Sequence, residues 1–373
     1  MSDEPTPRER RPSGAFLPSQ RLREGEAPAA TPVEEVALQD LHEIKLLLRG
    51  ESVVDWHRLH IQTGDDARRL FALNALDLDD EGDAARLERI RGQAVQYINQ
   101  TLKLRLDERV GKDVALIELP VIASSEDDRH QRQACILLKV MHIIYHLDAR
   151  ELRTALSIAD SDLFALVEES VVRMFDELRT AGVPVVEFAW SRKTRDSLIT
   201  KLLVKRETSA ARVFDRLRFR VVVERQEDLG PTLHVMLSRC IPFNYVVPGQ
   251  TVNNLVDVNA LRDVEAEKDP HAEDSGATEV LDPAQSNMHS SKKFRVLNFI
   301  ADLPVRVDDL FPAGREELAR DRGRVVFVLA EFQVLDRTTA TANETGESAH
   351  EVYKNRQHKS VKERLLRTPT KKD

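Results

Sequence analysis

An alternation of apolar and basic side chains predicts a β-strand at residues 216–223. Apolar side chains at the odd positions alternate with Arg216, Arg218 and Arg220, and successive side chains of a strand point to opposite faces of the sheet. Three guanidinium groups therefore line one face of the predicted strand. Because a guanidinium stays charged and its planar fork matches phosphate oxygens, this face is suited to a polyphosphate.

A second strand is predicted at residues 325–335, where the sequence VVFVLAEFQVL is almost entirely apolar. Strands that are apolar on both faces are usually central in a sheet. Glu331 and Gln333 interrupt this strand on one face. A buried carboxylate is destabilising unless it meets a cation or a metal ion. We therefore consider two roles for Glu331: a functional carboxylate, or the salt-bridge partner of an arginine in the first strand.

Helical and strand periodicity predict the remaining elements, which give an α+β fold class with an all-α first half. The predicted helices span residues 36–48, 84–106, 131–147, 160–180, 192–206, 231–240, 308–320 and 341–366. The further predicted strands span residues 185–190, 243–250 and 293–303. The first of these three is expected at an edge of the sheet.

The predicted helix that precedes the arginine strand has a cationic face. Lys193, Ser197, Lys201 and Lys205 recur every four residues and so share one side of that helix. Like charges at this spacing repel each other, so a polyanion would stabilise the face; the alternative is an ordinary solvated lysine face. Asp215, just before the arginine strand, is either a salt-bridge partner of these cations or a Mg²⁺ ligand that neutralises phosphate charge.

The composition is typical of a folded protein without a membrane-spanning segment. Of the 373 residues 41% are apolar, so the chain can bury at least one hydrophobic core. The net charge is −8, so basic side chains are concentrated in local patches and the protein as a whole is not cationic. No apolar run is long enough to cross a bilayer and the charged N-terminal region shows no hydrophobic signal segment, so we expect a cytoplasmic protein. Two cysteines, Cys135 and Cys240, are too few for a disulfide framework or a zinc site.

The first half of the chain gives few functional signals. Residues 1–32 are rich in proline, arginine and glutamate, which predicts a disordered segment. Residues 33–182 are expected to form a helical domain that serves as a cap, a dimerisation module or a regulatory element. His142 and His146 lie four apart on an apolar helix. No glutamate lies between them as in the zincin pattern, so we interpret them as core or helix-end residues.

Polar residues recur in four short blocks along the second half. The first block lies on the cationic helix, with Lys193, Ser197 and Lys201 at intervals of four. The second consists of Asp215 and Arg220. The third falls in the strand predicted at residues 293–303. The fourth begins with Glu331 and Gln333 and continues with Glu344, Gly346, His350, Tyr353 and Lys354.

In order and spacing, these blocks resemble the nucleotidyltransferase domain of RelA/SpoT-type (p)ppGpp synthetases over residues 185–366. The family patterns are Arg-x-Lys-x-x-x-Ser-x-x-x-Lys, then Asp-x-x-Gly-x-Arg, then Gly-Tyr-x-Ser-x-His, and finally Glu-x-Gln followed by Ala-Glu-x-Gly-x-x-x-His-x-x-Tyr-Lys. The chain has Ser191 where the first family pattern has arginine, and Arg218 where the second has glycine. It has Phe294 and Asn298 where the third has tyrosine and histidine. Leu335 stands where the family has an arginine after the glutamine of Glu-x-Gln.

The resemblance implies a mixed β-sheet of the nucleotidyltransferase type, flanked by helices, and Mg²⁺-dependent transfer of pyrophosphate from ATP to the 3′-hydroxyl of GDP or GTP. It implies that Asp215 and Glu331 hold Mg²⁺ and are catalytic, with Glu331 also accepting the proton of the attacking hydroxyl. Phe294 or Tyr245 would stack on a base. The nucleotide-binding set expected from it is Lys193, Ser197, Lys201, Arg218, Arg220, Tyr245, Phe294, Asn298, Gln333, Glu344 and His350.

The departures from the family keep two other functions open. One is the same chemistry on another acceptor, either a different nucleotide or the 3′ end of tRNA. The other is a catalytically inactive nucleotide-binding protein with a regulatory or scaffold role. Long members of the family carry a hydrolase domain with an adjacent His-Asp pair. None of the eleven histidines here is followed by aspartate, so no hydrolase activity is expected.

The domain organisation expected from these observations places the synthetase-like domain at residues 183–366. Residues 263–288 form an acidic insertion, expected to be a mobile loop, either passive or a lid. Residues 367–373 form a basic tail. The basic end of the last predicted helix is interpreted as solvated, with contact to RNA as the alternative. Oligomerisation through the helical half is compatible with the pattern.

Overall fold

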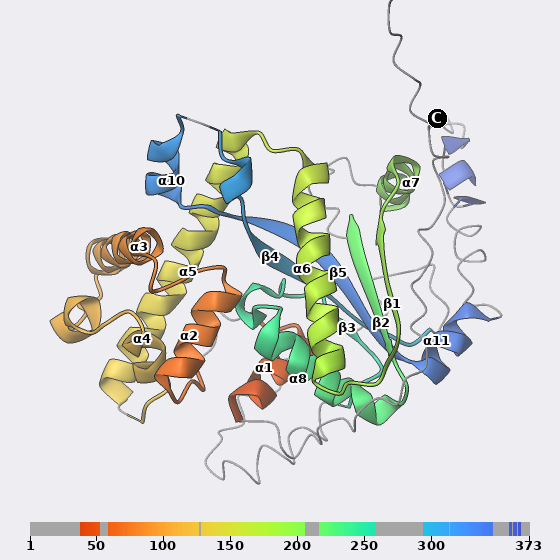
Figure 1. The fold of residues 1–373 in the computed structure, drawn as a ribbon, viewed down its shortest axis with the longest axis horizontal. Helices are drawn as coiled ribbons and strands as arrows, with labels where there is room; N and C mark the ends of the chain where they lie inside the picture. The colour runs from red at the N-terminus through yellow and green to blue at the C-terminus, as the bar shows by residue number, and fades with distance from the viewer. Residues whose placement is uncertain are drawn as a thin grey trace, which may run out of the picture.

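A single mixed sheet holds the strands of the second half together (Figure 1). The computed structural model describes residues 38–52, 59–126, 128–205, 216–257, 294–312, 314–345, 358–359, 361–363 and 365–366. Two predicted site residues, Asp215 and His350, lie outside these ranges, as do Gly346, Tyr353 and Lys354 of the fourth block.

The sheet has five strands in the order β1-β2-β5-β4-β3. The strands are β1 (Val185–Arg192), β2 (Leu217–Val223), β3 (Val252–Asn253), β4 (Leu297–Arg306) and β5 (Val325–Asp336). β2 and β5 run parallel, whereas the other neighbours are antiparallel. The α+β class, the edge position of the first strand and the central position of the Glu331 strand are therefore confirmed.

A row of phenylalanines crosses one face of the sheet and continues into a helix. Phe219 of β2 and Phe299 of β4 stack on either side of Phe332 of β5, with ring centroids 5.4 and 5.3 Å apart. Phe188 of β1 lies 6.4 Å from Phe219 and 4.6 Å from Phe175 of α6 (Asp160–Thr180). Aromatic pairs between neighbouring strands stabilise one register over its alternatives.

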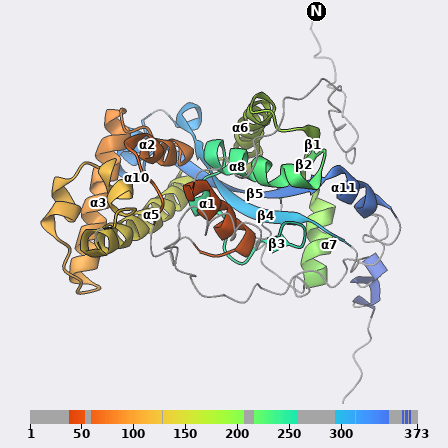
Figure 2. The same ribbon diagram turned by 90° about the horizontal axis from the view of Figure 1, so that it is seen from below.

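Two helices cover this phenylalanine face. The helix α6 and the helix α8 (Leu229–Arg239) lie on one side of the sheet, and α7 (Arg195–Lys205) lies on the other (Figure 2). Buried side chains of α1 (Leu38–Arg49), which packs against α8, belong to the same apolar cluster as α6 and the strands. The predicted boundary between a helical and a synthetase-like domain at residues 182 and 183 stays a prediction.

A second apolar cluster joins the other helices of the first half. It contains side chains of α2 (Gly64–Leu73), α3 (Glu81–Gln100), α4 (Glu118–Ile122) and α5 (Asp128–Leu156). Val325 and Phe327 of β5 also belong to it. Since Phe327 and Phe332 lie at odd and even positions of one strand, α5 packs on the face of β5 opposite to the phenylalanine row.

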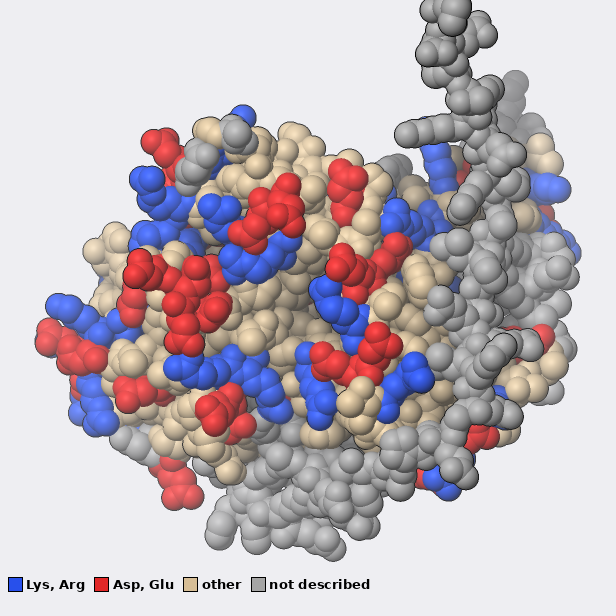
Figure 3. Space-filling model, in the orientation of Figure 1, with Lys and Arg blue, Asp and Glu red and all other residues tan. Residues whose placement is uncertain are grey.

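The remaining helical segments are short. They are η3 (Arg109–Asp113), η5 (Gln226–Asp228), η6 (Phe243–Tyr245), η8 (Asp308–Leu310), α10 (Glu316–Arg322) and α11 (Arg337–Glu344). No helix in the described ranges is long and apolar enough to cross a membrane. Acidic and basic side chains are interspersed over the face seen in Figure 3.

Three predicted elements differ from the structure. Residues 243–250 do not form a strand: Pro242 precedes a 3₁₀ turn in which the N–H of Tyr245 donates to the Pro242 carbonyl, and Val246 makes one isolated bridge. The helix expected at residues 308–320 is split into η8 and α10. The helix expected at residues 341–366 begins earlier, at Arg337, because Asp336 caps its N-terminus, and it is interrupted at Thr345, which is extended. Residues 358–359, 361–363 and 365 are helical, and residues 346–357 of this prediction lie outside the described ranges.

We expect the phenylalanine row to be the main determinant of stability in the sheet. Phe332 is fully buried at its centre, so Phe332→Ala should lower the free energy of unfolding by about 3–5 kcal/mol, measured by urea denaturation. Phe311→Ala, at a half-buried phenylalanine after η8, is the matched control and should have a clearly smaller effect. Equal losses in the two variants would contradict a special role for the row.

Candidate functional site

The polar face of the sheet lies opposite to the phenylalanine row and carries five of the predicted site residues. In the parallel pair β2 and β5, Arg218 lies opposite Glu331 and Arg220 lies opposite Gln333. In the antiparallel pair β4 and β5, Asn298 lies opposite Gln333. The five side chains alternate with the core-facing phenylalanines and so share one face. The structure thus brings together five residues that the sequence placed in separate blocks.

Glu331 is the centre of this group and is only 4% exposed. Its Oε2 accepts a hydrogen bond from Arg218 Nε at 2.7 Å. Its Oε1 accepts hydrogen bonds from Asn298 Nδ2 at 2.6 Å and from Gln333 Nε2 at 3.2 Å. The salt-bridge alternative for Glu331 is therefore the arrangement observed. Arg218 stands where the family resemblance has glycine, and its side chain neutralises the buried carboxylate.

Arg220 has carboxylate partners of a different kind. Its Nη2 donates to Glu344 Oε1 of α11 at 2.7 Å, and its Nε lies 3.6 Å from Glu187 Oε1 of β1. The Glu344 side chain is 62% exposed, whereas that of Glu331 is 5% exposed. Ion pairs in high dielectric are weak, so Glu344 can be displaced from Arg220 more easily than Glu331 from Arg218.

The lysine block extends from Lys193, before α7, to Lys201 within that helix, and α7 lies on the polar side of the sheet (Figure 2). The helix begins at Arg195 rather than at residue 192, and the backbone N–H of Lys193 donates to the Arg216 carbonyl at 2.8 Å. Lys193 therefore precedes the helix, and the prediction that it shares a helix face with Ser197 and Lys201 is wrong. Thr194 Oγ1 accepts from the N–H of Ser197 at 3.3 Å, which ends the extended segment and starts the helix.

The two aromatic candidates lie apart from each other. Phe294 is half-buried against the main core, just before β4. Tyr245 is 5% exposed and packs against α5 and β5, with its ring centroid 4.5 Å from that of His142 and 4.3 Å from that of Phe327. Burial raises the pKa of the Tyr245 hydroxyl above its usual range. Base stacking by either ring stays a prediction.

The residues around Glu331 do not fit a Mg²⁺ ion as they are arranged. Mg²⁺ requires near-octahedral oxygen coordination, but both Glu331 oxygens accept N–H donors and one donor is a cation. The buried Oδ1 of Asn298 is one oxygen that accepts no hydrogen bond from the described residues. Within the described ranges, no three His, Cys, Asp or Glu side chains form a metal-binding group. Asp215, the other expected ligand, lies outside those ranges.

One polar residue of this face, Asp302, was not predicted from the sequence, and it pairs with His146, which was interpreted as a core or helix-end residue. Asp302 lies on β4 at the same parity as Asn298, and Ile300 between them pairs with Glu331. His146 Nε2 of α5 lies 2.8 Å from Asp302 Oδ2. The signal was present, since Asn298 and Asp302 interrupt an apolar strand on one face, but the partner helix of Asp302 could not be known from periodicity.

Comparison with known proteins finds distant structural similarity to small alarmone synthetases. No protein-family model matches the chain, and no curated protein matches it. Small alarmone synthetase 2 from Bacillus subtilis is 12% identical, with a TM-score of 0.31 over 54% of this chain and 92% of that one. Small alarmone synthetase 1 from the same organism is 11% identical, with a TM-score of 0.27 over 61% and 91%.

The same synthetase 1 bound to its product pppGpp is 14% identical, with a TM-score of 0.29 over 58% of this chain and 88% of that one. Similarity at this level carries no information about activity.

The Arg218–Glu331 pair should be energetically coupled. In a double-mutant cycle of Arg218→Met and Glu331→Met, followed by urea denaturation, we expect a coupling energy of about 1–2 kcal/mol, because Glu331 is buried while Arg218 is partly exposed. The control pair is Arg173–Glu169, two side chains 65% and 68% exposed on α6, for which about 0.3–0.5 kcal/mol is expected. Equal coupling in both cycles would show that Glu331 is held by its amide partners.

His142 should make the protein less stable in mild acid. Burial, with a smaller effect of His146, lowers the pKa of His142 from 6.5 to about 4. The unfolded imidazole therefore takes up a proton first as the pH falls, and stability is lost between pH 6.5 and pH 4.

From pH 7 to pH 5 this group should remove about 2 kcal/mol from the free energy of unfolding. The measurement is urea denaturation of the wild type and of His142→Phe at both pH values. The variant should lose less stability than the wild type by this amount; parallel losses would mean that His142 titrates normally.

Proposed function

We propose that the polar face of the sheet binds the phosphate groups of a nucleotide, with the Arg218 guanidinium paired to Glu331, the carboxylate to which the family resemblance assigns a metal ion. The observation that carries this proposal is the Arg218–Glu331 pair. Glu331 is itself fixed by Asn298 and Gln333. An arginine whose Nε is held by a buried carboxylate has a fixed guanidinium plane, so little conformational entropy is lost when a phosphate binds.

The exposure of the two arginines supports phosphate binding at their outer edge. The Arg218 side chain is 34% exposed and that of Arg220 is 25% exposed, so solvent reaches both. A nucleotide phosphate can replace the exposed Glu344 carboxylate at Arg220 with little loss. Lys193 and Lys201, which the resemblance assigns to ATP phosphates, would add charge from the α7 side.

The resemblance also indicates which nucleotides to test. The order of the lysine, arginine and Glu-x-Gln blocks is that of proteins that take ATP and GDP or GTP. We therefore propose purine nucleoside di- and triphosphates as ligands. The regulatory or scaffold role considered from the sequence requires only this binding.

Mg²⁺-dependent pyrophosphate transfer is the second candidate function. Glu331, Gln333 and Arg220 lie side by side on adjacent strands, as the second and fourth blocks require. Transfer by this face has one precondition: Arg218 must leave Glu331, because a carboxylate paired with a guanidinium is a poor proton acceptor and a poor metal ligand. Transfer to another nucleotide or to a tRNA end has the same precondition.

The binding proposal predicts metal-independent nucleotide affinity. In calorimetric titrations with ATP, GDP and GTP, the full chain should bind at least one of them in EDTA as well as in Mg²⁺. Arg220→Ala and Arg218→Ala should each weaken binding by about tenfold or more, as expected for a lost charge-assisted hydrogen bond. Arg225→Ala, at an exposed arginine just after β2, is the control and should bind normally.

A transfer assay separates the two functions. The chain and Arg218→Gly are incubated with labelled ATP, Mg²⁺ and, in turn, GDP, GTP and tRNA. Binding without AMP release supports the first proposal. AMP release matched by a labelled acceptor in the wild type establishes transfer. Transfer gained only in Arg218→Gly identifies Arg218 as the residue that prevents it. Absence of nucleotide binding under every condition overturns both functions.

A further inference from the structure

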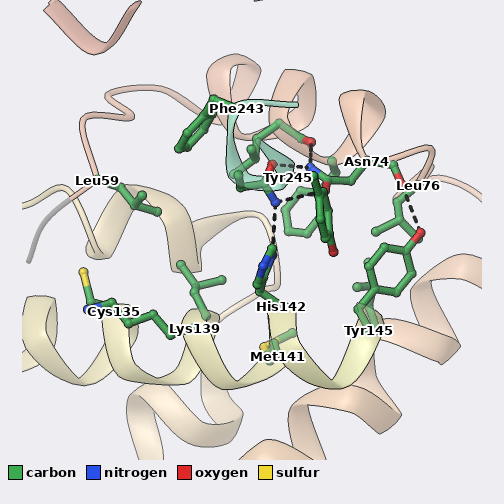
Figure 4. A pocket seen from close by; sticks show the side chains of 15 residues that line it. Leu59, Asn74, Leu76, Cys135, Lys139, Met141, His142, Tyr145, Phe243 and Tyr245 are labelled. Atoms are coloured by element: carbon green, nitrogen blue, oxygen red, sulfur yellow. Dashed lines mark hydrogen bonds between the residues drawn. The ribbon is translucent and has the colours of Figure 1, made fainter. Parts of the chain in front are cut away.

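A cavity of about 120 Å³, partly open to solvent, lies between α2, α5 and the turn of η6 (Figure 4). Apolar side chains form almost all of its surface, including Leu70, Phe71, Leu138, Met141 and Phe243. An engineered apolar cavity of about 150 Å³ stays dry and takes up benzene, so a space of this size accommodates one aromatic ring.

One wall of the cavity is polar and internally hydrogen-bonded. His142 points from α5 toward the η6 turn, and its Nδ1 lies 3.3 Å from Asn244 Nδ2 (Figure 4). Asn244 Nδ2 also donates to Asn74 Oδ1 at 3.0 Å. Tyr145 donates its hydroxyl to the Asn74 carbonyl at 3.0 Å. An apolar cavity with a few converging polar groups is the usual composition of a small-molecule site.

The charges at the cavity favour a neutral ligand. Its described lining contains no aspartate or glutamate that would attract a cation. Burial, with a smaller electrostatic effect of His146, lowers the pKa of His142 to about 4, so this imidazole is neutral near pH 7 and attracts no anion. Lys139 also contributes to the lining; lysines commonly bury the aliphatic stem while the ammonium group reaches water.

We propose that this cavity binds a small neutral molecule with one aromatic ring, or an aliphatic group of similar size, and a single hydrogen-bonding group directed at the His142 wall. Phenol is a representative ligand. The site is independent of the phosphate-binding proposal, since its lining shares no residue with the Glu331 group. It adjoins the sheet through Tyr245, which contacts Phe327 of β5.

Methyl NMR of the full chain tests this proposal. The chain has five methionines, and their methyl groups can be labelled with ¹³C. Met141 lines the cavity, whereas Met236 is fully buried in the main core and serves as an internal control. Addition of phenol should shift the Met141 resonance in a saturable way and leave Met236 in place.

Two kinds of variant make the test specific. Leu138→Phe fills the cavity and should weaken phenol binding at least tenfold; Leu70→Phe is a second filling variant in case the first does not fold. His142→Leu keeps the cavity apolar but removes the polar partner, so it should abolish the preference for phenol over benzene that the wild type is expected to show.

Several results would overturn the proposal. A Met141 resonance that does not move, or moves together with Met236, would show that no ligand enters this cavity. Unchanged phenol binding in both filling variants would place the ligand elsewhere. Tighter binding of benzoate than of phenol, lost in Lys139→Met, would replace the neutral ligand class with an anionic one.

Discussion

The packing of phenylalanines between β1, β2, β5 and β4 fixes the register on which the polar face depends. Phe219, Phe332 and Phe299 are paired directly across three strands, and the next residue on β2 or β5 points to the other side. A shift of one residue would exchange the two faces of a strand. The apolar face therefore determines which polar side chains meet, and it places Arg218 beside Glu331.

The charge on the polar face is balanced from within the protein. Because Glu331 is buried, its charge must be neutralised by a nearby group. The partly exposed guanidinium of Arg218 does this; the resemblance has glycine at the Arg218 position and assigns a metal ion to Glu331. Arg220 is balanced by Glu344, which is largely exposed. The two arginines therefore differ in the strength with which they are held. Arg218 pairs with a buried carboxylate of the sheet, whereas the partner of Arg220 is exposed and can be replaced by an incoming anion.

Periodicity predicted the strands well because burial on two faces leaves a clear signal, as in the apolar strand around Glu331. It also anticipated that this acid needs a cation, without deciding between Arg218 and a metal ion. It failed at Pro242 and at Asp336, where a turn and a helix cap override an apolar or helical pattern. The pairing of His146 with Asp302 depends on how α5 packs across the sheet, which no local pattern contains.

The parallel pairing of β2 and β5 has a consequence for how the protein folds. Arg218 and Glu331 are 113 residues apart in the chain, so their meeting requires closure of a long loop, and contacts of large sequence separation slow folding. During synthesis, β2 is complete long before its neighbour exists, and its unpaired edge resembles those that promote aggregation. The guanidinium groups of Arg218 and Arg220 keep one face of β2 charged until β5 has been synthesised. This charge disfavours pairing of β2 with a strand of another chain.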